Sequence, residues 1–164
     1  MRRVKLDRID RQILRDLQDS GRMTNVELAA RAGISAPPCL RRVRALEEAG
    51  VLRGYHAEIN AEALGFTVTV FALVGLHSQA QADLRAFEEL VSQWDEVREM
   101  HMLQGETDFL LKIVAADGPS YQEFLNTRLT AAPNVAQVRS LQTLRSAKHL
   151  PGVPIAAEPA KTEA

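Results

Sequence analysis

Two consecutive prolines, Pro37 and Pro38, limit the fold of this 164-residue chain more than any other feature. They precede an amphipathic, arginine-rich segment, "CLRRVRALEEAG". The residue before a proline is disfavoured in helical geometry, whereas a proline in the first turn of a helix costs no hydrogen bond. The sequence therefore predicts a helix that begins abruptly near Pro38.

The side chains of this helix separate into an apolar and a basic part. At about 100° per residue, the apolar face consists of Leu40, Val43 and Leu46. We expect this face to pack on neighbouring helices. Arg41 then points away from the core, while Arg42 and Arg44 lie on the two flanks. Cys39 lies near the apolar face and is expected to be a small core residue, with a redox switch as the alternative.

Two shorter helices are predicted before this one. Asp7 can start the first helix, and Gly21 follows its end. Thr24 and Glu27 form a T-x-x-E capping box for the second, which Gly33 ends. The apolar residues of the first helix are Ile9, Ile13, Leu14 and Leu17. The second of these helices, the tight turn at Gly33 and the basic helix that follows it together describe a helix-turn-helix.

The positive charge of the chain is concentrated in this region. Residues 1–53 hold 12 Lys and Arg against 7 Asp and Glu, a net charge of +5, whereas residues 54–164 have a net charge of −6. This asymmetry favours an N-terminal module that faces a polyanion, with an ordinary solvated surface as the alternative. One such module offers few phosphate contacts, so we expect the chain to be an oligomer.

The basic helix supplies the main candidates for contact with double-stranded DNA. We predict that Arg41 reads base edges in the major groove and that Arg42 and Arg44 bind phosphates. The segment "GVLRGYHAEIN" is expected to be extended, a wing that carries Arg53. The other DNA-binding candidates are Asn25, Ser35 and Pro37. The alternative is a solvated helix face on which Arg44 pairs with Glu48.

After Asn60 the pattern changes to alternating strands and helices. The predicted elements are strands at 66–77, 96–104, 108–116 and 135–148 and helices at 81–94 and 118–132. The order β-α-β-β-α-β is ferredoxin-like, as in ACT-like domains. Two helices can cover only one face of this sheet. Because the first strand is apolar on both faces, we expect a second copy of the chain to bury the other face.

The predicted fold class is therefore α+β, a winged helix-turn-helix followed by a ferredoxin-like domain. The domains are residues 1–60 and 61–149, and residues 150–164 are expected to be a disordered tail because they hold three prolines and little apolar content.

The first 50 residues resemble the N-terminal domain of the Lrp/AsnC family, the feast/famine transcription regulators. The resemblance rests on the start "LDRIDRQIL", the second helix "NVELA" and the recognition helix "PPCLRRVRALEEAG", and it continues at lower density to about residue 148. It implies a homodimer formed through the sheet domain, which in many members assembles into an octamer. It also implies a small amino-acid effector bound at an interface between dimers.

In that family the turn between the middle strands helps to bind the effector through a G-x-x-D pattern, which Gly105 and Asp108 supply here. Glycine lets the backbone approach a ligand, and a carboxylate suits an α-ammonium group. The alternative is an ordinary hairpin turn in which Asp108 only pairs or caps. Thr107 stands where family members often carry an aromatic residue. The candidate effector-binding residues are Leu103, Gly105, Glu106, Thr107, Asp108, Gln142 and Thr143.

Other kinds of site have little support. Glu99 and His101 share a strand face near Asp108, but no second motif supports a metal site, and no cofactor is required. The chain lacks a phosphate-binding loop or a nucleophile motif, so we do not expect an enzyme. No apolar run is long enough to span a membrane, and the basic start has no apolar core behind it. A cytoplasmic location is therefore expected.

The sequence thus predicts a sequence-specific DNA-binding transcription regulator whose sheet domain senses an amino acid. Ligand bound between dimers would change the spacing or number of paired recognition helices. One alternative is a ligand-insensitive architectural DNA-binding protein whose sheet domain only forms oligomers. The other is an amino-acid-binding or metabolic enzyme with an incidental basic end.

Overall fold

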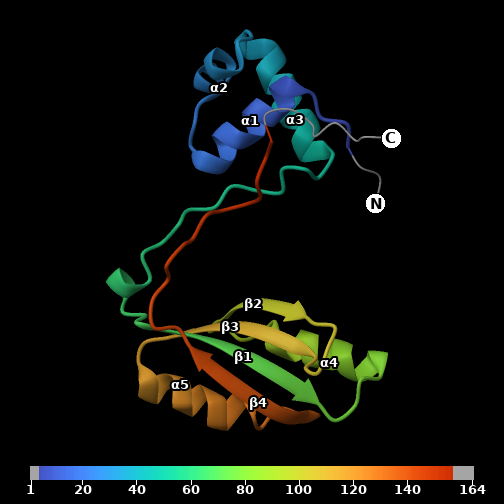
Figure 1. The fold of residues 1–164 in the computed structure, drawn as a ribbon, viewed down its shortest axis with the longest axis vertical. Helices are drawn as coiled ribbons and strands as arrows, with labels where there is room; N and C mark the ends of the chain where they lie inside the picture. The colour runs from blue at the N-terminus through green and yellow to red at the C-terminus, as the bar shows by residue number, and fades with distance from the viewer. Residues whose placement is uncertain (1–3, 157–164) are drawn as a thin grey trace. The chain divides into compact units, whose positions relative to one another are not determined.

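The computed structural model of the chain describes residues 4–156 (Figure 1). It divides into two compact units. The helical unit holds the described residues up to Glu58 together with those from Lys148 onward, and the sheet unit is Ile59–Ala147. The boundary after Glu58 lies two residues before the predicted one. Among the described residues, no helix has the length and apolar character that crossing a membrane requires.

Three helices form the helical unit: α1 (Arg8–Asp19), α2 (Asn25–Ala32) and α3 (Ala36–Glu48). They pack around Ile13 and Cys39, which are both fully buried. Burial raises the pKa of the Cys39 thiol, consistent with the predicted core position. The predicted starts of α1 and α2 are confirmed, since Asp7 and Thr24 each form a capping box.

The start of α3 differs from the prediction by two residues. The helix begins at Ala36, so both prolines lie in its first turn. The first N–H groups of a helix have no acceptor within it, and the first backbone bond of α3 runs from the Cys39 N–H to the Ser35 carbonyl, at 3.3 Å. The prolines therefore remove only donors that the helix does not use.

The apolar face of α3 is also rotated from the predicted one. Leu40 is 39% exposed, whereas Cys39 is fully buried, and the core face is Cys39, Val43 and Leu46. The segment after α3, expected to be an extended wing, contains no β-strand in residues 50–60. It is held to α3 by the Tyr55 hydroxyl, which donates to Glu47 Oε1 at 2.9 Å.

The sheet unit has the predicted β-α-β-β-α-β order. Its strands are β1 (Val68–Leu76), β2 (Val97–Met102), β3 (Phe109–Ala115) and β4 (Val135–Gln142). They form an antiparallel sheet in the order β2-β3-β1-β4. The helices are α4 (Gln81–Val91) and α5 (Gly118–Phe124), with a short 3-10 helix, η1 (Glu62–Leu64), before β1.

Both helices cover one face of this sheet. The inward side chains of β1 and β3 are almost completely buried: Val70, Ala72, Val74, Phe109, Leu111 and Ile113. They pack against Phe87 and Val91 of α4 and Tyr121 and Phe124 of α5. The opposite face carries Phe71 on the central strand, half-buried. The prediction that β1 is apolar on both faces while the helices cover only one is confirmed.

Two details of the sheet unit differ from the prediction. The helix expected at 118–132 is α5 followed by a π-helix, η2 (Leu125–Leu129). Strand β4 ends at Gln142 rather than residue 148, because β1 begins at Val68 and offers no partner beyond the bond from Thr143 N–H to the Thr69 carbonyl.

The C-terminal segment also departs from the prediction. Residues 150–156 have no regular secondary structure, yet they belong to the helical unit, where Ile155 packs on the helical core. Disorder was expected for 150–164, and this is wrong for 150–156. Residues 157–164 lie outside the described residues.

Candidate DNA-binding and ligand-binding sites

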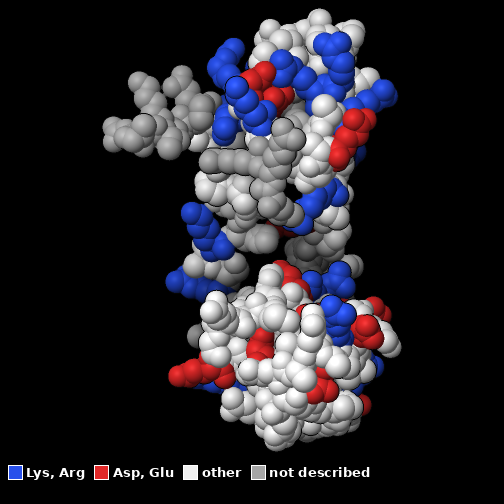
Figure 2. Space-filling view, turned by 90° about the vertical axis from the view of Figure 1, so that its right-hand side faces the viewer, with Lys and Arg blue, Asp and Glu red and all other residues white. Residues whose placement is uncertain are grey.

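The three arginines of α3 lie in different environments. Arg41 and Arg44 are exposed, and within residues 4–156 neither forms an ion pair. The suggested pairing of Arg44 with Glu48 is therefore absent. Figure 2 shows many Lys and Arg side chains on the visible face of the helical unit. Two unpaired guanidinium groups on an exposed helix face are available to bind phosphates or base edges.

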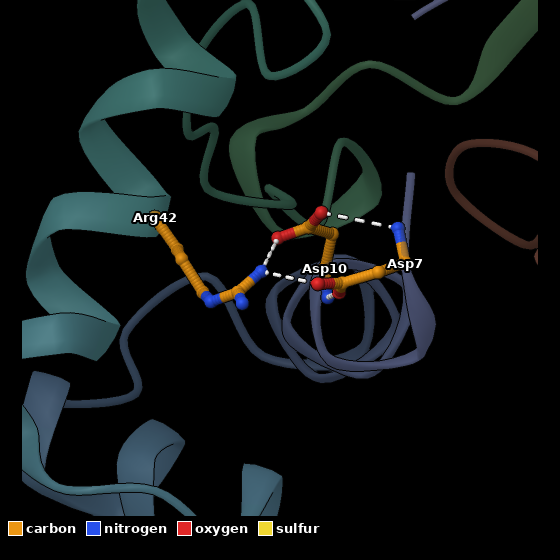
Figure 3. A network of polar contacts seen from close by, with 3 residues as sticks. All are labelled: Asp7, Asp10 and Arg42. Atoms are coloured by element: carbon orange, nitrogen blue, oxygen red, sulfur yellow. Dashed lines mark hydrogen bonds and ion pairs between the residues drawn. The ribbon is translucent and has the colours of Figure 1, made fainter. Parts of the chain in front are cut away.

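Arg42 is bound inside the helical unit. Its Nη1 lies 2.7 Å from Asp7 Oδ2 and 2.7 Å from Asp10 Oδ1, so α3 is joined to the first turn of α1 (Figure 3). The backbone N–H of Asp10 and then the Arg42 guanidinium hold the pKa of Asp7 below its ordinary value. Hydrogen bonds to Asp10 and Asp7 raise the pKa of Arg42 further.

This arrangement changes the interpretation of Arg42. We expected it to bind DNA phosphate, but the structure commits one of its terminal nitrogens to two carboxylates, and its side chain is only 33% exposed. Asp7 and Asp10 thus hold Arg42 in place, although the sequence pattern indicated only that Asp7 starts the helix. The available signal was the pair of acidic residues three positions apart at the start of α1.

The remaining DNA-binding candidates lie at different places. Ser35 and Pro37 are exposed at the start of α3, and Arg53 is exposed in the segment after it. Asn25 is half-buried, and its Nδ2 donates to the Ala36 carbonyl at 2.8 Å. The Asn25 amide therefore joins the start of α2 to the start of α3.

The turn between β2 and β3 contains most of the effector-binding candidates. Gly105 and Glu106 are exposed, Thr107 is half-buried and Asp108 is buried. The Leu103 N–H donates to the Asp108 carbonyl at 2.8 Å and closes the turn.

Asp108 has a structural role in this turn. Its Oδ2 accepts a hydrogen bond from the Leu76 N–H at 2.7 Å, and its own N–H donates to the Val74 carbonyl at 2.9 Å. It therefore fixes the end of β1 where the register shifts between Gly75 and Leu76. In the described part of the chain, Oδ1 has no hydrogen-bond partner. One carboxylate oxygen caps the strand and the other is free.

The structure does not bring the other two candidates to this turn. Gln142 pairs with Val70 and Thr143 with Thr69, whereas Asp108 is bound to Leu76. Leu76 lies six positions after Val70 along β1, which corresponds to about 20 Å. The two groups of candidates lie at opposite ends of β1 in one chain.

The suggested metal-binding residues form an ion cluster. Glu99 accepts a hydrogen bond from Lys112 Nζ at 2.8 Å and lies 3.4 Å from His101 Nε2. Lys112 holds the pKa of Glu99 below its ordinary value, with a smaller effect from His101. Asp108 does not join this cluster, since its Oδ2 accepts from the Leu76 N–H, and the described residues contain no group of three His, Cys, Asp or Glu that could hold a metal ion.

Replacing Arg42 with alanine should lower the free energy of unfolding of the helical unit by about 1–2 kcal/mol, because two partly exposed charge-assisted hydrogen bonds are removed. Arg41→Ala removes the same charge from an exposed position and should change it by less than about 0.5 kcal/mol. Urea unfolding followed by circular dichroism measures both. The pKa of Asp7 is lowered from 3.8, so the carboxylate becomes protonated and loses its ion pair as the pH falls. The loss of unfolding free energy caused by Arg42→Ala should therefore become smaller below about pH 4. A deficit that stays constant to pH 3 would contradict the ion pair.

Replacing Asp108 with alanine should destabilise the sheet unit by about 1–3 kcal/mol, because the buried Leu76 N–H loses its acceptor. Asp108→Asn keeps an oxygen that can accept this bond and should cost much less. Calorimetric unfolding of the two variants gives the comparison. Equal losses would show that the negative charge, rather than the hydrogen bond, stabilises the turn.

Both parts of the chain match models of known domains. Residues 6–53 match a winged helix-turn-helix DNA-binding domain, and residues 69–153 match the Lrp/AsnC ligand binding domain.

Whole-chain relatives agree with these matches. The chain is 57% identical to a leucine-responsive regulatory protein of Rhizobium meliloti over 146 residues, which cover 89% of this chain and 94% of that protein. It is 40% identical to a Bkd operon transcriptional regulator of Pseudomonas aeruginosa, over 87% of this chain and 94% of that one.

A similar solved structure is a transcriptional regulator of Neisseria meningitidis in complex with L-methionine. It superposes with a TM-score of 0.86 at 36% identity, over 92% of this chain and 97% of that one. An AsnC family regulator of Agrobacterium tumefaciens gives 0.85 at 34% identity, over 91% and 97% of the two chains. With its helix-turn-helix, its ligand-binding domain and these relatives, the chain belongs to the Lrp/AsnC family of DNA-binding transcription regulators and is not an enzyme.

Proposed function

We propose that the protein binds specific DNA sequences through α3 and changes its DNA affinity when an amino acid binds to the sheet unit. The observation that supports DNA binding is that the arginines of α3 lie in different environments. Arg41 and Arg44 are exposed and unpaired within the described chain, while Arg42 is held by α1. Helix α3 is thereby fixed on the core while its outer arginines face solvent. A DNA target is consistent with the cytoplasmic location that we propose for the protein.

The open face of the sheet supports a homodimer. Phe71, Leu73, Leu110 and Leu141 lie on this face by register, since Phe71 pairs with Leu141 and Leu73 with Leu110. Leu141 is 45% exposed. Lys112 and Arg139 share the same face and can surround the apolar centre with charge. A second copy of the chain is the occupant that we propose, because an identical sheet presents the same apolar surface.

An amino-acid effector fits the turn at residues 103–108. The free Oδ1 of Asp108 can accept from an α-ammonium group, and the exposed Gly105 leaves room beside it. The Neisseria relative was solved with L-methionine. Gln142 and Thr143 lie about 20 Å from the turn in one chain, so a site that uses both groups takes them from two copies. This supports a ligand site between dimers, and assembly beyond the dimer, to an octamer, follows from the family resemblance.

DNA recognition can be tested on duplexes that the wild-type protein itself selects from a random library. Binding to the enriched sequence is measured by fluorescence anisotropy over a range of salt concentrations. Arg41→Ala should weaken this binding by about 1–3 kcal/mol, and Arg44→Ala should reduce the log–log salt slope by about 0.9 for each phosphate that is no longer neutralised. Arg85→Ala removes the same charge from an exposed position on α4 and is the matched control. Equal effects of Arg41→Ala and Arg85→Ala would contradict recognition by α3.

Effector binding can be tested by thermal shift against the twenty amino acids, after carried-over ligand has been removed by unfolding and refolding. A bound amino acid at 100 times its dissociation constant should stabilise the protein by about 2.7 kcal/mol. The stabilisation should disappear in Asp108→Asn, which keeps the acceptor for Leu76 N–H but removes the charge. The outcome against this proposal is no stabilisation by any amino acid at millimolar concentration. That outcome favours the ligand-insensitive architectural DNA-binding protein.

A further inference from the structure

The chain passes from one unit to the other twice. It leaves the helical unit after Glu58, and it returns at Lys148 after the last strand of the sheet unit. In the returning segment, residues 148–156, Ile155 packs on the core of the helical unit. The helical unit is therefore connected to the sheet unit by two covalent segments.

A single glutamine of α1 holds the returning segment. Gln18 Nε2 donates to the Val153 carbonyl at 3.0 Å, and the Val153 N–H donates to Gln18 Oε1 at 3.0 Å. The side-chain amide thus satisfies both backbone groups of Val153, as a neighbouring strand would. A glutamine amide has both a donor and an acceptor, and here both meet the backbone of one residue, so the geometry indicates a specific contact.

The sequence of the segment suits this contact. Gly152 has a φ of +70°, which an L side chain rarely adopts. A Cβ built on Gly152 would lie 2.5 Å from Gln18 Cδ and closer still to Oε1. Pro151 and Pro154 flank the contact and restrict the free segment, which lowers the entropy lost on docking. The prolines that suggested disorder in the sequence thus favour one docked conformation.

We propose that residues 148–156 form a strap that connects the end of β4 to α1 and restrains the DNA-binding helices. Nine residues lie between Thr143, which directly follows β4, and Val153, which is hydrogen-bonded to Gln18 of α1. At its other end, α1 holds Arg42 of α3 through Asp7 and Asp10. A change at the end of β4 therefore has a continuous route through the strap and α1 to α3. Its regulatory use rests on the proposed function, because Gln142 and Thr143 are candidate effector contacts.

The strap is tested by hydrogen exchange with mass spectrometry on the full chain. Gly152→Ala and Gln18→Glu should each release the strap. Gly152→Ala introduces backbone strain and a Cβ that overlaps with Gln18, whereas Gln18→Glu places a carboxylate oxygen against the Val153 carbonyl. Amides in the C-terminal half of α1 and the Val153 amide should then exchange about tenfold faster. Gly65→Ala and Gln79→Glu are the matched controls. Gly65 has a φ of +86° with open space around it, and Gln79 is exposed in the sheet unit.

Two results would overturn the proposed strap. One is hydrogen exchange in α1 and at Val153 that stays unchanged in both strap variants, and the other is exchange that is equally fast in the control variants.

The regulatory role of the strap is tested by measuring the affinity for the enriched DNA with L-leucine and with L-methionine as probes. If either changes DNA affinity in the wild-type protein, that change should fall at least threefold in Gly152→Ala but persist in Gly65→Ala. An undiminished change in Gly152→Ala overturns the regulatory role. If no amino acid changes the DNA affinity of the wild-type protein, the proposed effector function fails. The hydrogen-exchange data still show in that case whether the strap is docked on α1.

Discussion

The contacts along α1 determine how the DNA-binding unit is held together. Ile13 fills the core, and polar groups on other turns bind three separate segments: Asp7 and Asp10 bind Arg42 of α3, Asp16 binds Arg31 of α2 at 3.3 Å, and Gln18 binds the C-terminal strap. The hydrophobic effect is non-directional. Directional bonds at both ends of α1 therefore add to the orientation that close packing gives the helix. The position of α3 therefore depends on α1 more than on its own caps, since Ser35 forms no side-chain cap.

The two neighbouring arginines Arg41 and Arg42 show how one turn of helix can serve stability and recognition together. Successive residues on a helix differ by about 100°, so a side chain beside an outward one reaches the flank of the helix. Arg42 lies there and finds the carboxylates of α1 at 2.7 Å, while Arg41 remains in solvent. The bond to Arg42 takes one positive charge away from the surface that we propose for DNA binding. Arg41 is presented from a fixed helix, which would lower the entropy lost in the proposed contact with a base edge.

Much of this structure follows from periodicity and turn chemistry. The T-x-x-E box, the glycine at residue 33 and the alternation in β1 predicted their elements correctly, because each depends on neighbours within a few residues. The change from a helical pattern to alternating strands and helices after Asn60 predicted the two domains, and the family resemblance agrees with it. The interactions that were missed all join residues far apart in sequence: Arg42 with Asp7, Gln18 with Val153, and Asp108 with Leu76. A wheel or an alternation pattern places a side chain on a face but does not say which distant group it meets. The end of β4 was missed for the same reason, since β1 sets it.

Asp108 illustrates why such long-range interactions matter for the interpretation of a binding site. A carboxylate that only bound ligand would leave the Leu76 N–H at the irregular end of β1 without an acceptor. A carboxylate that only capped the strand would need no negative charge, because a neutral amide oxygen accepts the same bond. The buried position and the free Oδ1 suit a residue that does both. Binding a cationic group at Oδ1 would then act directly on the bond that fixes β1, whose opposite end pairs with Gln142 at the start of the path to the strap. If the proposed effector binds at Oδ1, its binding and the geometry of the central strand are coupled through one side chain.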